Sequence, residues 1–201
     1  MEGSAGGTPD CSSVKPASLL WIIAFCFSLT IAAPAAADET RFHRGLKEIE
    51  LAAGYGFKLD LRRLEGRTDT PFVSLSPRFG RFVNSRLEHL IELQLALFTR
   101  PEDEFLGSAT YLLRQHLTNG GRLCPFVEVG AGVAGTTLRI PELGGSFQFV
   151  LQAGVGVRVA AGRRESLTAG IRFYHLSNAG LRSPNTSLNN GLITVGYSRL
   201  Y

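Results

Sequence analysis

A histidine and a serine stand two residues apart near the C-terminal end of the chain, at His175 and Ser177. On a β-strand, residues two apart point to the same face, so these side chains share a surface. A histidine next to a hydroxyl can accept its proton and make it a nucleophile. The Asn178-Ala179-Gly180 turn that follows supplies an amide side chain and close backbone N–H groups, which suit an oxyanion hole. These residue types and their spacing predict the hydrolysis of an ester.

The same pair has a simpler interpretation. Strand ends commonly carry His and Ser, where the two residues form only a polar rim. The choice between these two interpretations therefore depends on the elements that position the pair and on the longer segment around it.

Those elements are predicted by an alternation of large apolar residues with small or polar ones, which is the period of a β-strand. Turn-like stretches such as residues 68–71, 119–121 and 161–164 separate the alternating segments. The pattern predicts eight strands, at residues 49–59, 73–80, 87–97, 105–117, 127–134, 147–159, 166–173 and from 193 towards the C terminus. Strands in this succession are typical of an up-and-down meander.

Two barrels fit such strands: a soluble, lipocalin-like barrel with its apolar face inside, or a membrane barrel with that face outside. The second face combines Gly and Ala with Glu, Gln and Arg, which suits the narrow interior of an eight-stranded barrel. The terminal Tyr201 resembles the aromatic C-terminal signal of outer-membrane barrels. We therefore expect an all-β fold, an eight-stranded antiparallel up-and-down transmembrane β-barrel. His175 and Ser177 would then face lipid, and the predicted substrate is an ester within the membrane.

Residues 175–180, with Pro184-Asn185 after them, closely resemble the signature of the PagL-type lipid A 3-O-deacylase family. The resemblance implies an enzyme in the outer membrane of a Gram-negative bacterium. Such an enzyme hydrolyses the ester-linked acyl chain at the 3 position of lipid A, without a metal or other cofactor.

The resemblance also implies a role for each residue of the motif. His175 would be the general base and Ser177 the nucleophile. Asn185 and the backbone amide of Gly180 would stabilise the oxyanion, and Asn178 would help to shape that site.

One position departs from the family's pattern. Where the family has the acid of its catalytic triad, this sequence has Asn189, followed by Asn190, and no Asp or Glu occurs after Glu165. An amide can orient a histidine, but it cannot balance the charge of an imidazolium. Three explanations stay open: Asn189 orients His175 in a slower enzyme, an acid comes from elsewhere, or the barrel is a non-catalytic protein with a structural or lipid-binding role.

The N-terminal region predicts export. Lys15 precedes an apolar run over residues 19–33, and Ala35-Ala36-Ala37 follow it, as in a secretory signal peptide. We expect residues 1–37 to be a cleaved signal peptide and residues 38–201 to form the barrel domain, with an N-terminal membrane anchor as the alternative. The stretch before Val14 is long and acidic for a leader, which favours a later translation start.

Composition narrows the class of protein further. The chain is 44% hydrophobic and 19% charged, below the roughly 25% of charged residues in ordinary soluble domains. This excludes a disordered chain, and the single long apolar run excludes a polytopic helical membrane protein. Once the leader is removed, Cys124 is the one remaining cysteine, so an internal disulfide is excluded.

The charge and the remaining histidines bear on partners. The net charge of +4 is spread along the chain, which disfavours nucleic acid and favours a modest attraction to anionic lipid. His43, His89 and His116 lack the spacing of metal ligands, so we expect no metal. The expected partners are lipid A or lipopolysaccharide and the outer membrane, and a homodimer is one assembly that we consider.

Overall fold

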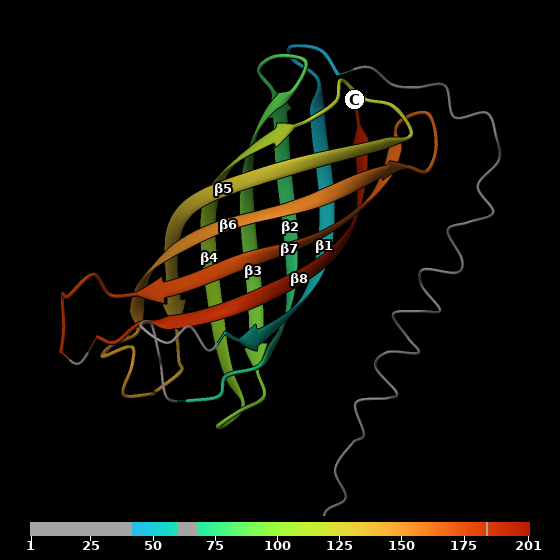
Figure 1. Cartoon of the computed structure of the whole chain (residues 1–201). Helices are drawn as coiled ribbons and strands as arrows, with labels where there is room; N and C mark the ends of the chain where they lie inside the picture. The colour runs from blue at the N-terminus through green and yellow to red at the C-terminus, as the bar shows by residue number, and fades with distance from the viewer. Residues whose placement is uncertain (1–41, 60–67, 184) are drawn as a thin grey trace, which may run out of the picture. The chain divides into compact units, whose positions relative to one another are not determined.

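The computed structural model describes residues 42–59, 68–183 and 185–201 (Figure 1). The described residues form eight strands: β1 Lys47–Lys58, β2 Phe72–Phe82, β3 Leu87–Phe98, β4 Glu104–His116, β5 Leu123–Thr136, β6 Phe147–Ala160, β7 Glu165–Ser177 and β8 Leu188–Leu200. In this part of the chain, no helix is long and apolar enough to cross a membrane. The predicted signal peptide lies outside the described residues, so the boundary at residue 37 stays a prediction.

Each strand pairs antiparallel with the next one, and β8 pairs with β1 to close the barrel (Figure 1). The eight-stranded up-and-down barrel predicted from the sequence is therefore confirmed. Three strands are clearly longer than predicted: β5 spans Leu123–Thr136, β7 continues to Ser177, and β8 already begins at Leu188. The first residues of β8, Leu-Asn-Asn-Gly-Leu, do not alternate in character, so the sequence pattern alone misses them.

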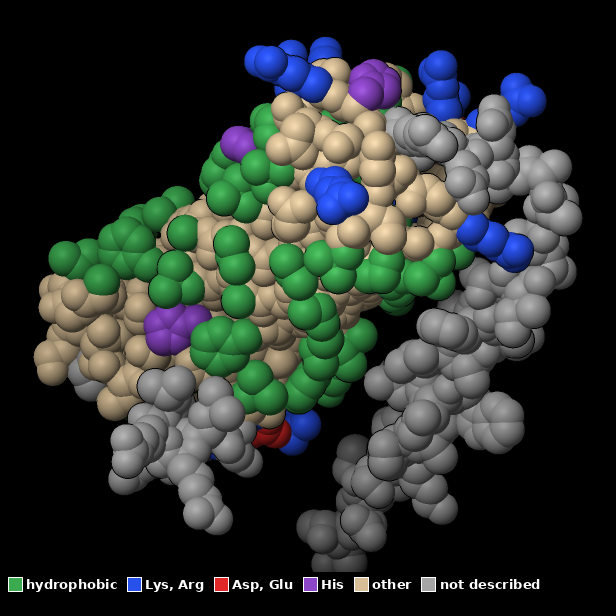
Figure 2. Space-filling model, turned by 45° about the horizontal axis from the view of Figure 1, so that its top comes forward, with side chains coloured by type: hydrophobic (Ala, Val, Ile, Leu, Met, Phe, Trp, Pro, Cys, Tyr) green, Lys and Arg blue, Asp and Glu red, His purple; other side chains and the backbone are tan. Residues whose placement is uncertain are grey.

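The outer wall of the barrel carries the large apolar side chains, which stand at odd-numbered positions of the strands. Leu95 is 70% exposed and Val195 is 59% exposed. Figure 2 shows such side chains spread over the wall. An apolar surface of this extent is unstable in water but matches the hydrocarbon of a bilayer. The outward placement of the apolar face is confirmed, and the soluble-barrel alternative is excluded.

The middle of the lumen holds a closed ring of three arginines and three glutamates, which we call the lumen ring. In order around the ring these are Glu50, Arg78, Glu92, Arg172, Glu128 and Arg114, which returns to Glu50. Arg78, for example, lies 2.7 Å from Glu50 and 2.6 Å from Glu92. Each guanidinium bridges two carboxylates, which offsets the cost of taking these charges out of water.

Apolar clusters close the lumen on both sides of the ring. One cluster lies at the end with the short turns 83–86, 117–122 and 161–164, which we call the turn end. It consists of Phe42, Leu46, Phe82, Cys124 and Leu200. The other cluster lies at the opposite end, the loop end, and includes residues of the long segment between β5 and β6, namely Leu138, Ile140 and Leu143. The lumen is therefore a packed core.

The lengths of the connections orient the barrel. At the loop end the segments between strands span residues 59–71, 99–103, 137–146 and 178–187, and most of them exceed the turns at the other end in length. Outer-membrane barrels have short periplasmic turns and longer extracellular loops. The loop end is therefore the extracellular end of the barrel.

Candidate active site

The His175 and Asn189 side chains meet on the outer wall, close to the loop end. β7 and β8 run antiparallel in a register that places His175 directly opposite Asn189. The His175 Nδ1 atom lies 2.7 Å from the Asn189 Oδ1 atom. An amide oxygen only accepts hydrogen bonds, so in this arrangement Nδ1 carries the imidazole proton and Nε2 is left as the basic nitrogen. The pair has the geometry of a histidine held by an orienting partner.

Ser177 is the last residue of β7 and lies on the same face of that strand as His175. Its hydroxyl makes no hydrogen bond to any residue that the structure describes, and neither does Nε2 of His175. Catalytic hydrogen bonds are often loose before substrate binds and tighten in the complex. Both polar atoms are thus available to a ligand that arrives from the membrane side.

Asn178 organises the loop that follows Ser177. Its Nδ2 atom donates to the backbone oxygens of Leu143 and Arg182, both at 2.9 Å, and its Oδ1 atom accepts from the Gly180 N–H at 2.9 Å. The side chain is 2% exposed. Asn178 therefore ties the β7–β8 loop to the β5–β6 loop.

The remaining predicted oxyanion residues lie in the same loop. The Oδ1 atom of Asn185 accepts from the backbone N–H of Asn178 at 3.2 Å, which fixes the amide plane. Within the described ranges, the Nδ2 group of Asn185 has no hydrogen-bond partner and is free to donate. The Gly180 N–H, in contrast, already donates to Asn178.

Backbone strain is concentrated beside this site. Among the described residues, the non-glycine residues with positive φ are Ala179 at 52° and Ser187 at 69°, and both belong to the β7–β8 loop. Left-handed backbone at such residues costs free energy and persists only where the surroundings hold it. The hydrogen bonds of Asn178 supply that support on the Ala179 side of the loop.

Aromatic rings border the site on the outer wall. The Phe173 ring stacks on the His175 imidazole with their centroids 6.2 Å apart. Phe57 of β1 covers Gly191, where an added Cβ would lie 2.4 Å from its ring. Asn189 itself is 3% exposed although it stands at an odd position. The His175–Asn189 pair therefore lies in apolar surroundings, where its hydrogen bond is stronger than in water.

Sequence reasoning missed the residues that hold the site from behind. Glu142 of the β5–β6 loop accepts two hydrogen bonds from Thr68, and its backbone oxygen accepts from the N–H of Thr186. This loop thereby joins the β1–β2 and β7–β8 loops. No pattern within any one of these segments signals the contact. Among the described residues, no group of three or more His, Cys, Asp or Glu side chains is placed to hold a metal ion.

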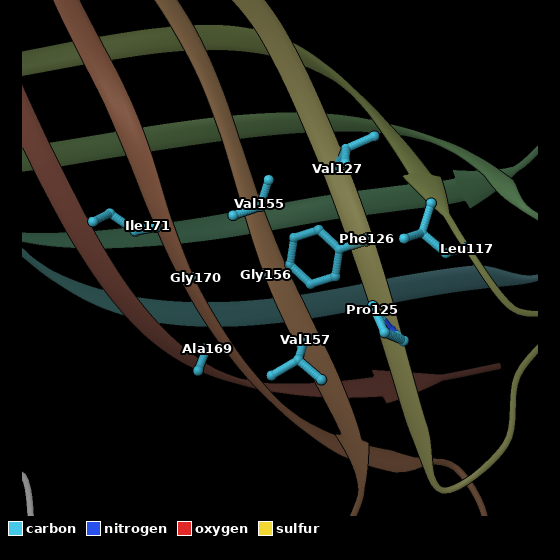
Figure 3. A pocket seen from close by; sticks show the side chains of 10 residues that line it. All are labelled: Leu117, Pro125, Phe126, Val127, Val155, Gly156, Val157, Ala169, Gly170 and Ile171. Atoms are coloured by element: carbon cyan, nitrogen blue, oxygen red, sulfur yellow. The ribbon is translucent and has the colours of Figure 1, made fainter.

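Two shallow apolar depressions lie on the outer wall. Figure 3 shows one of them across β5, β6 and β7, where Gly156 and Gly170 leave the wall thin. It contains none of the predicted site residues. The second depression runs between β4 and β7 and reaches Phe173, which stacks on His175. The wall near the candidate site is therefore grooved, apolar and open to lipid.

The closed barrel and its outward apolar belt define an outer-membrane β-barrel protein, which confirms the predicted location. The sequence model of one family, lipid A 3-O-deacylase (PagL), matches residues 51–198. The chain belongs to this family, as the motif after His175 led us to expect. The match includes all of the predicted site residues.

Individual relatives are more distant. Lipid A deacylase PagL of Pseudomonas aeruginosa strain PAO1 is 38% identical over 74 residues, which is 35% of this chain and 40% of that protein. The match thus spans less than half of the relative's length. Among solved structures, the outer-membrane enzyme PagL has a TM-score of 0.57 at 22% identity, over 74% of this chain and 97% of that one. Neisserial surface protein A has a TM-score of 0.63 at 15% identity, over 79% and 100%. These two structures support the fold.

Proposed function

We propose that this protein hydrolyses the ester that joins an acyl chain to the 3 position of lipid A, within the outer membrane. The observation that carries the proposal is the His175–Asn189 hydrogen bond of 2.7 Å, on the lipid-facing wall beside Ser177. Membership in the lipid A 3-O-deacylase family supports the same substrate and bond. A site on the outer wall meets its lipid from the side, without any passage through the lumen.

In the proposed mechanism, Nε2 of His175 takes the proton of the Ser177 hydroxyl while the oxygen attacks the ester carbonyl. The tetrahedral intermediate expels the sugar alkoxide, which takes the proton back from the imidazolium. Water then hydrolyses the acyl-serine with the same base and releases a fatty acid. Asn189 keeps the proton on Nδ1 throughout, which leaves Nε2 basic at the start of each step.

The oxyanion would be stabilised mainly by Asn185. Its Nδ2 group is free among the described residues, and its orientation is fixed by the N–H of Asn178. The Gly180 N–H can contribute only if it leaves Asn178 Oδ1 as substrate binds. Asn178 acts through the loop, because its Nδ2 group is committed to two backbone oxygens.

The acyl chain of the substrate would lie in the depression that reaches Phe173. The length of the acyl chain and its position along this depression would then determine how close its ester lies to His175. The outcome is a protein that acts on a lipid without extracting it from the bilayer.

The test uses purified protein mixed with lipopolysaccharide in detergent, with the mass of lipid A followed over time. We expect the loss of one 3-linked hydroxyacyl chain, and Ser177→Ala should lower the rate at least about a thousandfold. Ser85→Ala, in a turn at the far end of the barrel, is the matched control and should leave the rate unchanged. An unchanged lipid A spectrum across pH and detergent would instead identify a non-catalytic barrel. The homodimer considered from the sequence stays a prediction.

A further inference from the structure

The exposed charges of the barrel are distributed very unevenly between its two ends. The turn end carries eight exposed cations, which we call the basic rim: Arg44, Lys47, Arg81, Arg86, Arg122, Arg163, Arg164 and Arg199. Among the described residues, Glu165 is the one Asp or Glu side chain at that end outside the lumen. Figure 2 shows Lys and Arg side chains gathered around this end, at the top of the view.

The loop end has the opposite balance. Its described charged residues are four cations, Lys58, Arg100, Arg139 and Arg182, and five carboxylates, Asp69, Glu102, Asp103, Glu104 and Glu142. Arg100 pairs with Asp69 at 2.9 Å. The positive excess of the described chain outside the lumen therefore belongs to the turn end.

Two cations of the basic rim stand directly against each other. Lys47 on β1 and Arg81 on β2 are cross-strand partners, and both side chains are exposed. Neither has a carboxylate within ion-pair distance among the residues that the structure describes. Like charges directly opposite each other destabilise a strand pair. An anion between the two side chains would remove that cost.

The position of these cations indicates which anion they meet. Lys47, Arg81 and Arg199 each stand two residues from an exposed apolar residue of the same strand face. Those neighbours are Ile49, Phe79 and Tyr197. A step of two residues along a strand is about 6.6 Å, so the cations lie in the last part of the apolar belt, next to its end at Val83 and Tyr201. Phosphate groups of lipids lie at that level, whereas a soluble polymer would meet only the turns below it.

We propose that the basic rim binds the phosphate groups of anionic phospholipids in the periplasmic leaflet, with the Lys47–Arg81 pair as its centre. The turn end is periplasmic because its connections are the short ones. The role is independent of the proposed hydrolysis, whose site lies at the other end of the barrel. These contacts fix how deep the barrel lies in the membrane. They are made in the periplasmic leaflet, whereas the candidate active site lies in the outer leaflet.

The experiment measures the lipid selectivity of the mature protein in phosphatidylcholine bilayers. Spin-labelled phosphatidylglycerol and spin-labelled phosphatidylcholine are compared by the fraction of each that the protein immobilises. We expect an association at least about threefold stronger for phosphatidylglycerol at low salt, decreasing at 0.5 M salt. Lys47→Gln/Arg81→Gln should lower this ratio at least about twofold.

The matched control is Arg100→Gln/Arg139→Gln, which removes two exposed cations from the loop end and should keep the wild-type ratio. Circular dichroism and heat-dependent gel mobility verify that each variant forms a barrel. An equal ratio in the wild type and the rim variant would overturn the proposal, as would an equal decrease in the control. It also fails if phosphatidylglycerol shows no preference while dextran sulfate binds the wild type and not the rim variant, since the partner would then be a soluble polyanion.

Discussion

Two histidines of this barrel have similar chemical partners and opposite surroundings. His116 lies in the lumen, where its Nε2 atom is 3.0 Å from Glu88 and its Nδ1 atom is 3.5 Å from the Cys124 thiol. His175 lies on the outer wall, where its partner is the Asn189 amide and the nearby hydroxyl is Ser177. Judged by residue types alone, the lumen set of thiol, imidazole and carboxylate is the stronger catalytic combination.

The accessibility of the two sites to lipid reverses that ranking. His116 and Cys124 are fully buried. At the turn end the Phe82 ring stacks on His116, and the Phe42 ring packs against it at a tilt. His175 and Ser177 border lipid, and neither Nε2 of His175 nor the Ser177 hydroxyl makes a hydrogen bond to a described residue. A carboxylate is tolerated beside His116 because Arg114 and Arg158 lie within 4 Å of Glu88. On the lipid face a charge has no such partners and is costly, whereas an amide is much less so. Position relative to the membrane therefore decides which histidine can act on a lipid.

The comparison is tested most strongly by changing each histidine to glutamine. His175→Gln removes the proposed base, and we expect the rate of acyl release from lipid A to fall about a thousandfold, as for general bases elsewhere. His116→Gln keeps a hydrogen-bond donor for Glu88 and should leave the rate within about twofold, because His116 cannot contact the substrate. The measurement is the initial rate by mass spectrometry of lipid A. Equal losses in both variants would place the chemistry in the lumen and refute the comparison.

A second prediction concerns the charges of the lumen ring. Arg114→Met leaves Glu50 and Glu128 with one guanidinium each, and breaking a buried pair in this way costs about 3–5 kcal/mol. We expect the free energy of unfolding, measured by urea titration in lipid vesicles, to decrease by that amount. Arg139→Met, at an exposed position of the loop end, should change it by less than about 0.5 kcal/mol. Similar values for the two variants would mean that the ring contributes specificity rather than stability.

Much of this architecture follows from the sequence, because successive side chains of a strand point alternately to its two faces. Alternation correctly placed Leu95 and Val195 outside and Glu50 and Arg78 inside. The ring itself was not predictable, because it depends on the register of neighbouring strands. Register is fixed by turns and packing, which no single segment encodes.

The basic rim shows the same limit. Its cations are far apart in sequence, so the positive charge is spread along the chain. Successive strands of the up-and-down barrel run in opposite directions, so the start of one strand lies beside the end of the next. Lys47, near the start of β1, therefore lies at the same end of the barrel as Arg81 and Arg199, near the ends of β2 and β8. Cations that are spread along the sequence are therefore gathered at one end of the folded barrel.

For the candidate site, the motif supplied the residue types and the fold supplied their distances. Asn189 stands in a stretch without alternation, and only its pairing with His175 across β7 and β8 brings the two together. The part played by Asn178 was harder to foresee. Two of its three side-chain hydrogen bonds stay within its own loop, and the third reaches the backbone oxygen of Leu143 in the β5–β6 loop, 35 residues away in sequence. Contacts of that range leave no local signal.

The smallest expected effect concerns Asn189 and sharpens the comparison of the two histidines. Aspartate has the shape of asparagine, so Asn189→Asp places a carboxylate oxygen about where Oδ1 now lies, 2.7 Å from His175 Nδ1. A carboxylate stabilises the imidazolium that forms during catalysis, and we expect the rate of acyl release to increase about tenfold. Asn189→Leu removes the hydrogen bond at similar volume and should lower the rate. The increase should come with a loss of stability, because the charge borders lipid. If the rate of Asn189→Asp falls together with that of Asn189→Leu, the amide is itself the required partner, and this outer-wall site works without the carboxylate that His116 has in the lumen.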